Sequence, residues 1–166
     1  RKGWFHHDAE DSQVRSVDEL FSIWKGSVGG NATFLLNVPP NRHGLLADAD
    51  AEVLARLGEK IADFRSRRIE ASREDEGDVV ALRFDAPRAV GAVVLEEDIA
   101  QGQRIDEAVV TACVDGDVER EIARVRCVGY RRIITLETPV TATHVRVTVT
   151  KSRQGFYLAD AYGIEA

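Results

Sequence analysis

The chain has 166 residues, of which 44% are hydrophobic and 30% charged, and its formal net charge is −6 at pH 7. This composition is typical of a globular protein with one large domain or two small ones, and it excludes a disordered chain. The chain lacks the clustered basic residues of a nucleic-acid-binding protein, and no apolar run approaches the roughly 20 residues that cross a membrane. We therefore expect neither nucleic acid nor membrane among its partners.

The sequence opens with "RKGWFHHD", which gathers Trp4, Phe5, His6 and His7 within eight residues. Such a group of aromatic and polar side chains is typical of a ligand pocket. Adjacent side chains on an extended segment point to opposite sides, so we do not expect the two histidines to bind one metal ion. The sequence contains no methionine, and we expect it to be a truncated piece of a longer protein.

The stretch "SVDELFSIWKGSVGGN" predicts a helix over residues 17–28. Ser16 and Glu19 have the spacing of a capping box, and Gly29, Gly30 and Asn31 are typical of a helix end. The apolar residues follow the i, i+3, i+4 spacing of one buried helix face: Val17, Leu20, Phe21, Trp24 and Val28.

The next stretch, "ATFLLNV" at residues 32–38, is almost continuously apolar and predicts a strand covered on both faces. A polar turn then leads to a second predicted helix over residues 50–65. Alternating strands and helices favour an α/β fold with parallel strands, but one buried strand cannot form such a sheet alone. We therefore expect residues 1–65 to be the end of a larger domain.

The charged stretch that follows, residues 66–78, is interpreted as a solvated linker rather than a phosphate-binding site. From residue 79 the hydrophobic period changes to about two, as in "HVRVTVT". The short alternating runs predict an antiparallel β-sandwich over residues 79–166, with strands in these runs: 79–85, 89–98, 106–116, 119–129, 130–137, 142–151 and 157–165.

The chain has two cysteines, Cys113 and Cys127, and both fall in strand-like runs. Two cysteines make no disulfide framework, so we expect buried free thiols, with a disulfide between them as the alternative. Free thiols point toward a cytoplasmic protein without deciding the compartment.

Four segments resemble the α-L-fucosidases of glycoside hydrolase family 29, and in particular those acting on α-1,3/1,4-linked fucose. They are "GWFHHDAEDSQVRSVDEL", "GNATFLLNVPPNRHGLL", "VVLEEDIAQGQRIDEAVV" and "GYRRI", and they follow in order over nearly the whole chain. The resemblance implies the end of a (β/α)8 barrel over residues 1–65, with strands ending at Phe5 and spanning 32–38. A discoidin-like, galactose-binding-like β-sandwich over residues 79–166 would follow it.

The resemblance also implies the chemistry. In that family a carboxylate nucleophile and a carboxylic acid/base flank the scissile bond, as in other retaining glycosidases. The family motifs that carry both groups precede the first segment matched here, so no catalytic residue, metal or cofactor is assigned to this chain. We expect the C-terminal portion of a retaining exo-α-L-fucosidase whose partners are the remainder of the barrel and a fucosylated oligosaccharide. The alternative is a non-catalytic carbohydrate-binding or interdomain module.

Several residues are candidates for substrate binding under this resemblance. The indole of Trp4 suits the methyl corner of a 6-deoxy sugar, with Phe5 as its packing support, whereas the alternative is a pair of core aromatics. His6 stands where the family often has an aromatic residue and could reach a second sugar unit. Arg42 could hold the branched saccharide or be a solvated loop residue. Asn37 is expected to hold its own turn rather than the substrate.

The loop "LEEDIAQGQRI" at residues 95–105 is crowded with acidic and amide side chains. It could be a calcium-binding loop, although it lacks the ligand spacing of an EF-hand. It could also be a sugar-binding rim, or a brace that fixes the sandwich to the barrel through hydrogen bonds and ion pairs. We favour the brace, because fold analogy alone does not confer ligand binding.

Overall fold

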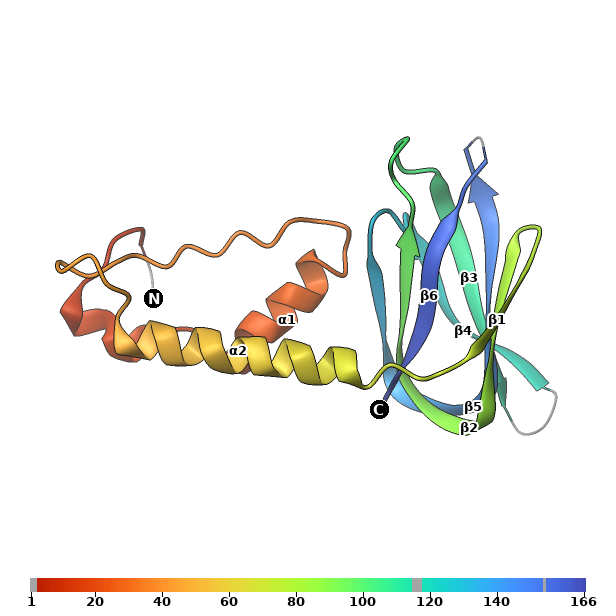
Figure 1. Ribbon diagram of the computed structural model, residues 1–166, viewed down its shortest axis with the longest axis horizontal. Coiled ribbons are helices and arrows are strands. Elements are labelled where there is room, and N and C mark those ends of the chain that lie inside the picture. Colours follow the sequence, from red (N-terminus) through yellow and green to blue (C-terminus); the bar gives the residue numbers. More distant parts are fainter. Residues whose placement is uncertain (1–2, 115–117, 154) are drawn as a thin grey trace.

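The computed structural model describes residues 3–114, 118–153 and 155–166, and a helical part lies beside a β part (Figure 1). The helical part contains a 3₁₀ helix η1 (Asp8–Gln13) and the α-helices α1 (Val17–Ser27) and α2 (Asp48–Ser66). The β part contains six strands: β1 (Ser72–Glu76), β2 (Val79–Glu97), β3 (Ile105–Val114), β4 (Val118–Arg126), β5 (Arg132–Ser152) and β6 (Leu158–Glu165). Within the described ranges, neither α-helix combines the length and apolarity required to cross a membrane.

The two predicted α-helices are confirmed. The Ser16 Oγ accepts a hydrogen bond from the Glu19 backbone N–H at 3.2 Å, as the capping pattern predicts. Helix α1 buries Leu20 and Trp24 on the face that the sequence pattern indicates. The ring of Trp24 packs edge-on against Phe64 of α2, with 5.9 Å between the ring centroids. The apolar stripes therefore pack the two helices against each other.

The predicted strand at residues 32–38 is wrong for this chain. The segment returns beside the helices without forming a strand, and Leu35 is 91% exposed (Figure 1). A strand requires a neighbour that pairs with its backbone N–H and C=O groups, and none of the described strands pairs with this segment. Residues 3–5 likewise form bends rather than the end of a strand.

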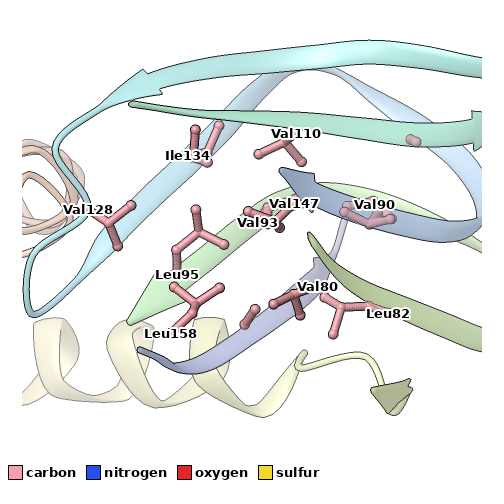
Figure 2. Packing of buried hydrophobic residues seen from close by; sticks show 14 of the residues in the cluster. Val80, Leu82, Val90, Val93, Leu95, Val110, Val128, Ile134, Val147 and Leu158 are labelled. Atoms are coloured by element: carbon pink, nitrogen blue, oxygen red, sulfur yellow. The ribbon is translucent and has the colours of Figure 1, made fainter. Parts of the chain in front are cut away.

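The β part is an antiparallel sheet folded into two layers, consistent with the predicted sandwich. Strand β2 pairs with β5 along most of its length, while its other edge pairs first with β1 and then with β6. Strand β5 also pairs with β3, which in turn pairs with β4. Apolar side chains from both layers meet in the interior, including Val93, Leu95, Val110 and Val147 (Figure 2).

Strands β2 and β5 are each longer than predicted. The sequence indicates two strands, 79–85 and 89–98, where the structure has the single strand β2. A register shift between Arg83 and Arg88 accommodates Pro87, which has no backbone N–H to donate to the ladder. The chain therefore passes from one layer to the other without leaving the strand.

The segment at residues 66–78 differs from the expected solvated linker. Strand β1 pairs with β2 from Ser72 opposite Arg83 onwards. The side chain of Ile69 is buried, and its backbone N–H donates to the carbonyl oxygen of Gly163 at 2.9 Å. This segment is therefore part of the sandwich, and its charged side chains are those of an edge strand.

A second apolar cluster joins the helices to the sheet. Trp24 and Phe64 pack against the outward-facing side chains of β2 and β6: Ala92, Val94 and Ile164. The Ile133 backbone N–H donates to the carbonyl oxygen of Gly29 at 2.8 Å, which fixes the end of α1 against β5. Cys113 is buried and Cys127 is partly buried, and the two cysteines do not form a disulfide, as predicted.

Candidate functional site

Trp4 and Phe5 lie on the surface, with 76% and 77% of each residue exposed. The side-chain amide of Asn37 donates to the carbonyl oxygen of Trp4 at 3.2 Å. The Asn37 amide, expected to hold its own turn, thus holds the segment of Trp4 instead. An exposed indole fixed through its backbone is free to contact a ligand or the side chains of a partner.

His6 lies between two carboxylates of η1. Its Nε2 is 3.0 Å from Asp11 Oδ1, and its Nδ1 is 3.5 Å from Asp8 Oδ1. Only 6% of the His6 side chain is accessible. Contacts to both ring nitrogens fix the orientation of the imidazole, so His6 presents little of its surface to a ligand.

Arg42 contacts the same acidic group from the loop before α2. Its Nη2 lies 3.5 Å from Asp8 Oδ2, and its side chain is largely exposed. His6, Asp8, Asp11 and Arg42 together line an open pocket of about 480 Å³. Asn41 shapes this loop, because its Oδ1 accepts from the backbone N–H groups of residues 43 and 45.

The structure thus brings His6 and Arg42 together through Asp8, a residue that the sequence interpretation did not select. The string "HHDAED" contains a signal, because it places two acids two and five residues after His6. Trp4 and Phe5 do not line this pocket. Gly3 and Asn37 instead line a smaller cavity of about 180 Å³ on the inner side of the same segments.

The loop after β2 is built around the buried carboxylate of Glu97, which is 4% exposed. Its Oε1 accepts from the backbone N–H groups of Arg104 at 2.6 Å and Ile105 at 3.1 Å, and its Oε2 accepts from that of Gly129 at 3.1 Å. Asp98 Oδ1 accepts from the N–H of Ala100. Across the described residues, no group of three or more His, Cys, Asp or Glu residues could hold a metal ion. Glu97 and Asp98 therefore organise the backbone of this loop.

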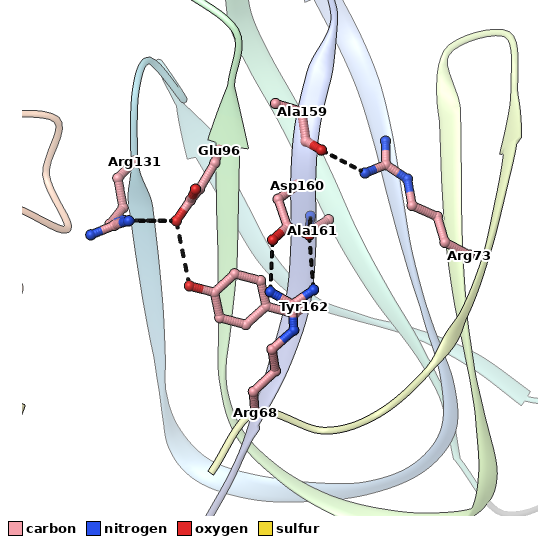
Figure 3. A network of polar contacts seen from close by, with 8 residues as sticks. All are labelled: Arg68, Arg73, Glu96, Arg131, Ala159, Asp160, Ala161 and Tyr162. Atoms are coloured by element: carbon pink, nitrogen blue, oxygen red, sulfur yellow. Dashed lines mark hydrogen bonds and ion pairs between the residues drawn. The ribbon is translucent and has the colours of Figure 1, made fainter. Parts of the chain in front are cut away.

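A polar network fixes the chain after α2 against β6 (Figure 3). Arg68 forms two bonds to the Asp160 carboxylate, at 2.7 and 3.1 Å, and its guanidinium lies 4.1 Å from the centroid of the Tyr162 ring. The Tyr162 hydroxyl donates to Glu96 at 3.4 Å, and Glu96 also pairs with Arg131 at 2.8 Å. Burial, and after it the negative charge of Glu96, raises the pKa of Tyr162.

Comparison with known proteins finds both curated relatives and solved structures similar to this chain, although no protein-family model matches it. The chain is 44% identical over 59 residues to α-L-fucosidase 1 of Arabidopsis thaliana, a match that covers 36% of this chain and 11% of that protein. The matched segment therefore spans about a tenth of the length of this curated relative.

Solved structures match over the whole chain. A proposed α-L-fucosidase from Bacteroides thetaiotaomicron superposes with a TM-score of 0.93 at 26% identity, covering 100% of this chain and 38% of that one. A glycoside hydrolase 29 family member from an unknown rumen bacterium superposes with a TM-score of 0.83 at 26% identity, covering 99% and 31%. These homologues and structural neighbours are α-L-fucosidases and members of glycoside hydrolase family 29.

Proposed function

We propose that this chain is the C-terminal portion of a retaining exo-α-L-fucosidase that removes α-1,3/1,4-linked fucose from oligosaccharides. The observation that carries the proposal is the superposition with a TM-score of 0.93 over the whole chain. The helical part, the irregular segments and the sandwich superpose together on that one structure. Similarity of the sandwich alone would not give a match over the whole chain.

In this proposal residues 1–65 are the end of a (β/α)8 barrel, and the partner is the remainder of that barrel. Exposed apolar residues support it, because Leu35 and Leu45 lie on the surface of the helical part. Large apolar side chains left in solvent are what a partner surface would cover. Residues 79–166 form the accessory, discoidin-like sandwich.

The substrate site in this proposal uses four residues of the chain. The indole of Trp4 packs on the methyl corner of fucose, and Phe5 supports it from the same exposed segment. Arg42 contacts the sugar next to fucose, and His6 acts with it through Asp8, which both side chains contact. The nucleophile and the acid/base come from the rest of the barrel, and the reaction needs no cofactor.

The test compares this chain with a longer protein that supplies the rest of the barrel. Residues 1–166 alone should not hydrolyse 4-nitrophenyl α-L-fucoside, whereas the longer protein should, with α-L-fucose as the first anomer seen by NMR. Its kcat/KM should be higher on α-1,3/1,4-fucosylated than on α-1,2-fucosylated oligosaccharides. Turnover by residues 1–166 alone would place the catalytic carboxylates in this chain and refute the proposal.

In the longer protein, Trp4→Ala should raise KM for the fucoside about tenfold, because packing on the methyl corner stabilises the ground state and the transition state alike. The matched control is Tyr157→Ala, which removes an exposed aromatic ring of the sandwich. An unchanged KM in Trp4→Ala, or an equal rise in both variants, would exclude Trp4 from the sugar site.

A further inference from the structure

The joint between the helical part and the sandwich is centred on Asn31. This residue follows α1, and it has a backbone φ of 63°. Asparagine is one of the few residues that adopt this left-handed conformation readily. The turn at Asn31 directs the chain into the extended segment 32–38.

The side chain of Asn31 is held by four residues of the sandwich, which we call the Asn31 cradle: Gln103, Cys127, Gly129 and Tyr130. Its Nδ2 donates to Gln103 Oε1 at 3.3 Å and lies 3.6 Å from the Cys127 Sγ. Its Oδ1 accepts from the Tyr130 backbone N–H at 2.9 Å. A Cβ at Gly129 would overlap the Asn31 amide, so the glycine leaves the space that the amide occupies.

The buried carboxylate of Glu97 joins the two loops that form the cradle. It accepts from Arg104 and Ile105, which follow Gln103, and from Gly129, which precedes Tyr130. A carboxylate that accepts several backbone N–H bonds away from water fixes those loops in one geometry. The cradle is therefore a rigid part of the sandwich.

The other end of the segment carries the candidate sugar site. Asn37 lies six residues after Asn31, and its amide donates to the carbonyl oxygen of Trp4. Since the described strands do not pair with residues 32–38, the bonds of Asn31 fix the start of this segment relative to the sandwich. Displacement of that start would move Asn37 and, through it, Trp4.

We infer that Asn31 is a positioning residue for substrate binding, through which the sandwich sets the place of Trp4 without touching the sugar. This inference rests on the proposed fucosidase function. It gives the sandwich a role in the affinity for fucosides that a separate carbohydrate-binding module would not have.

The experiment uses the longer protein with its barrel and measures KM and kcat for 4-nitrophenyl α-L-fucoside. Asn31→Gly removes the amide and keeps the backbone conformation accessible, so KM should rise about fivefold while kcat changes less than twofold. Asn31→Asp should keep KM within twofold of the parent, because the amide of Gln103 can turn and donate to the new carboxylate. Gln103→Ala is the second variant should Asn31→Gly not fold, and it should raise KM about threefold.

The matched control is Arg73→Ala. Arg73 donates to the carbonyl oxygens of Leu158 and Ala159, so its loss removes long-range bonds within the sandwich alone. This variant should lower the melting temperature without raising KM. An equal rise of KM in Arg73→Ala would overturn the inference, because general loosening would then explain the result.

The two proposals fail in different ways. If the longer protein is active and Asn31→Gly leaves its KM unchanged, the positioning role alone is overturned. The same holds for Gln103→Ala where that variant replaces Asn31→Gly. An inactive parent protein would overturn the fucosidase function and the positioning role with it.

Discussion

The sandwich and the helical part bury their apolar residues in different ways. The sandwich has its own core, in which residues such as Val90 and Leu95 are fully buried between two layers. The cluster formed by Trp24 and Phe64 instead needs the outer face of the sheet to be complete. Leu35 of the extended segment remains in solvent. The sandwich therefore has a core of its own, whereas the helical part depends on its neighbours.

The largest expected effect is the difference in stability loss between alanine substitutions of a buried and an exposed leucine. Leu95→Ala should lower the free energy of unfolding by about 2–5 kcal/mol, because it leaves a cavity in the sandwich core. Leu35→Ala is the matched control and should change it by less than about 0.5 kcal/mol, because that side chain is exposed. Urea unfolding of the two variants measures both values. A large loss in Leu35→Ala would show that the extended segment packs against the chain in solution.

The next effect concerns the contact of α1 with the sheet. A Cβ at Gly29 would collide with the carbonyl oxygen of Lys25 and lie 2.6 Å from the Cβ of Ile133. Gly29→Ala should therefore destabilise the protein by about 1–3 kcal/mol through overpacking.

Gly26 of α1 supplies the control. A Cβ there meets no atom within 4 Å, so Gly26→Ala should stabilise the protein by about 0.5–1 kcal/mol through helix propensity. Thermal unfolding distinguishes the two variants. Equal shifts of the melting temperature would mean that α1 does not rest on β5 as described.

The smallest effect is a change in pH dependence. The raised pKa of Tyr162 means that the folded state holds the phenol proton more tightly than the unfolded state. The resulting stabilisation is fully present below about pH 10, the ordinary tyrosine value, and is lost as the pH rises through the folded pKa. Tyr162→Phe should cost less than about 1 kcal/mol at pH 7 and flatten the loss of stability above pH 10.

Urea unfolding at pH 8 and pH 10.5 measures how far the free energy of unfolding falls between these two pH values. Tyr157→Phe is the control, because it removes the hydroxyl of a largely exposed ring. If the unfolding free energy falls equally steeply with pH in the parent protein and in Tyr162→Phe, the link between Tyr162 burial and alkaline stability is contradicted.

Local patterns predicted much of the fold. The cap at Ser16 and the apolar stripe of α1 are encoded within one short stretch, so the helix could be predicted from the sequence. Strand β1 was missed because its stretch is almost entirely charged, and only its pairing with β2 makes it a strand. Residues 32–38 show the reverse, since an apolar run formed no strand without a partner.

The candidate site was less predictable, because its contacts join distant residues. The motifs selected His6 and Arg42, yet their meeting at Asp8 depends on the path of the loop before α2. The loop at residues 95–105 was interpreted as a brace, and Gln103 does contact Asn31 of the helical part. The carboxylate of Glu97 also accepts from the backbone N–H of Gly129, a residue far along the chain, and no local pattern indicates this bond.

The long shared ladder of β2 and β5 has a consequence for the order in which the chain acquires its structure. Strand β2 pairs with β5 and β6, which follow it at a large separation in sequence. Closing such long loops is entropically costly and slows folding. On the ribosome, β2 emerges well before β5 and β6, and the sheet stays open until residues 158–165 have emerged as well. The nascent chain exposes unpaired edges of β2 during this interval, so we expect the risk of aggregation to be greatest then.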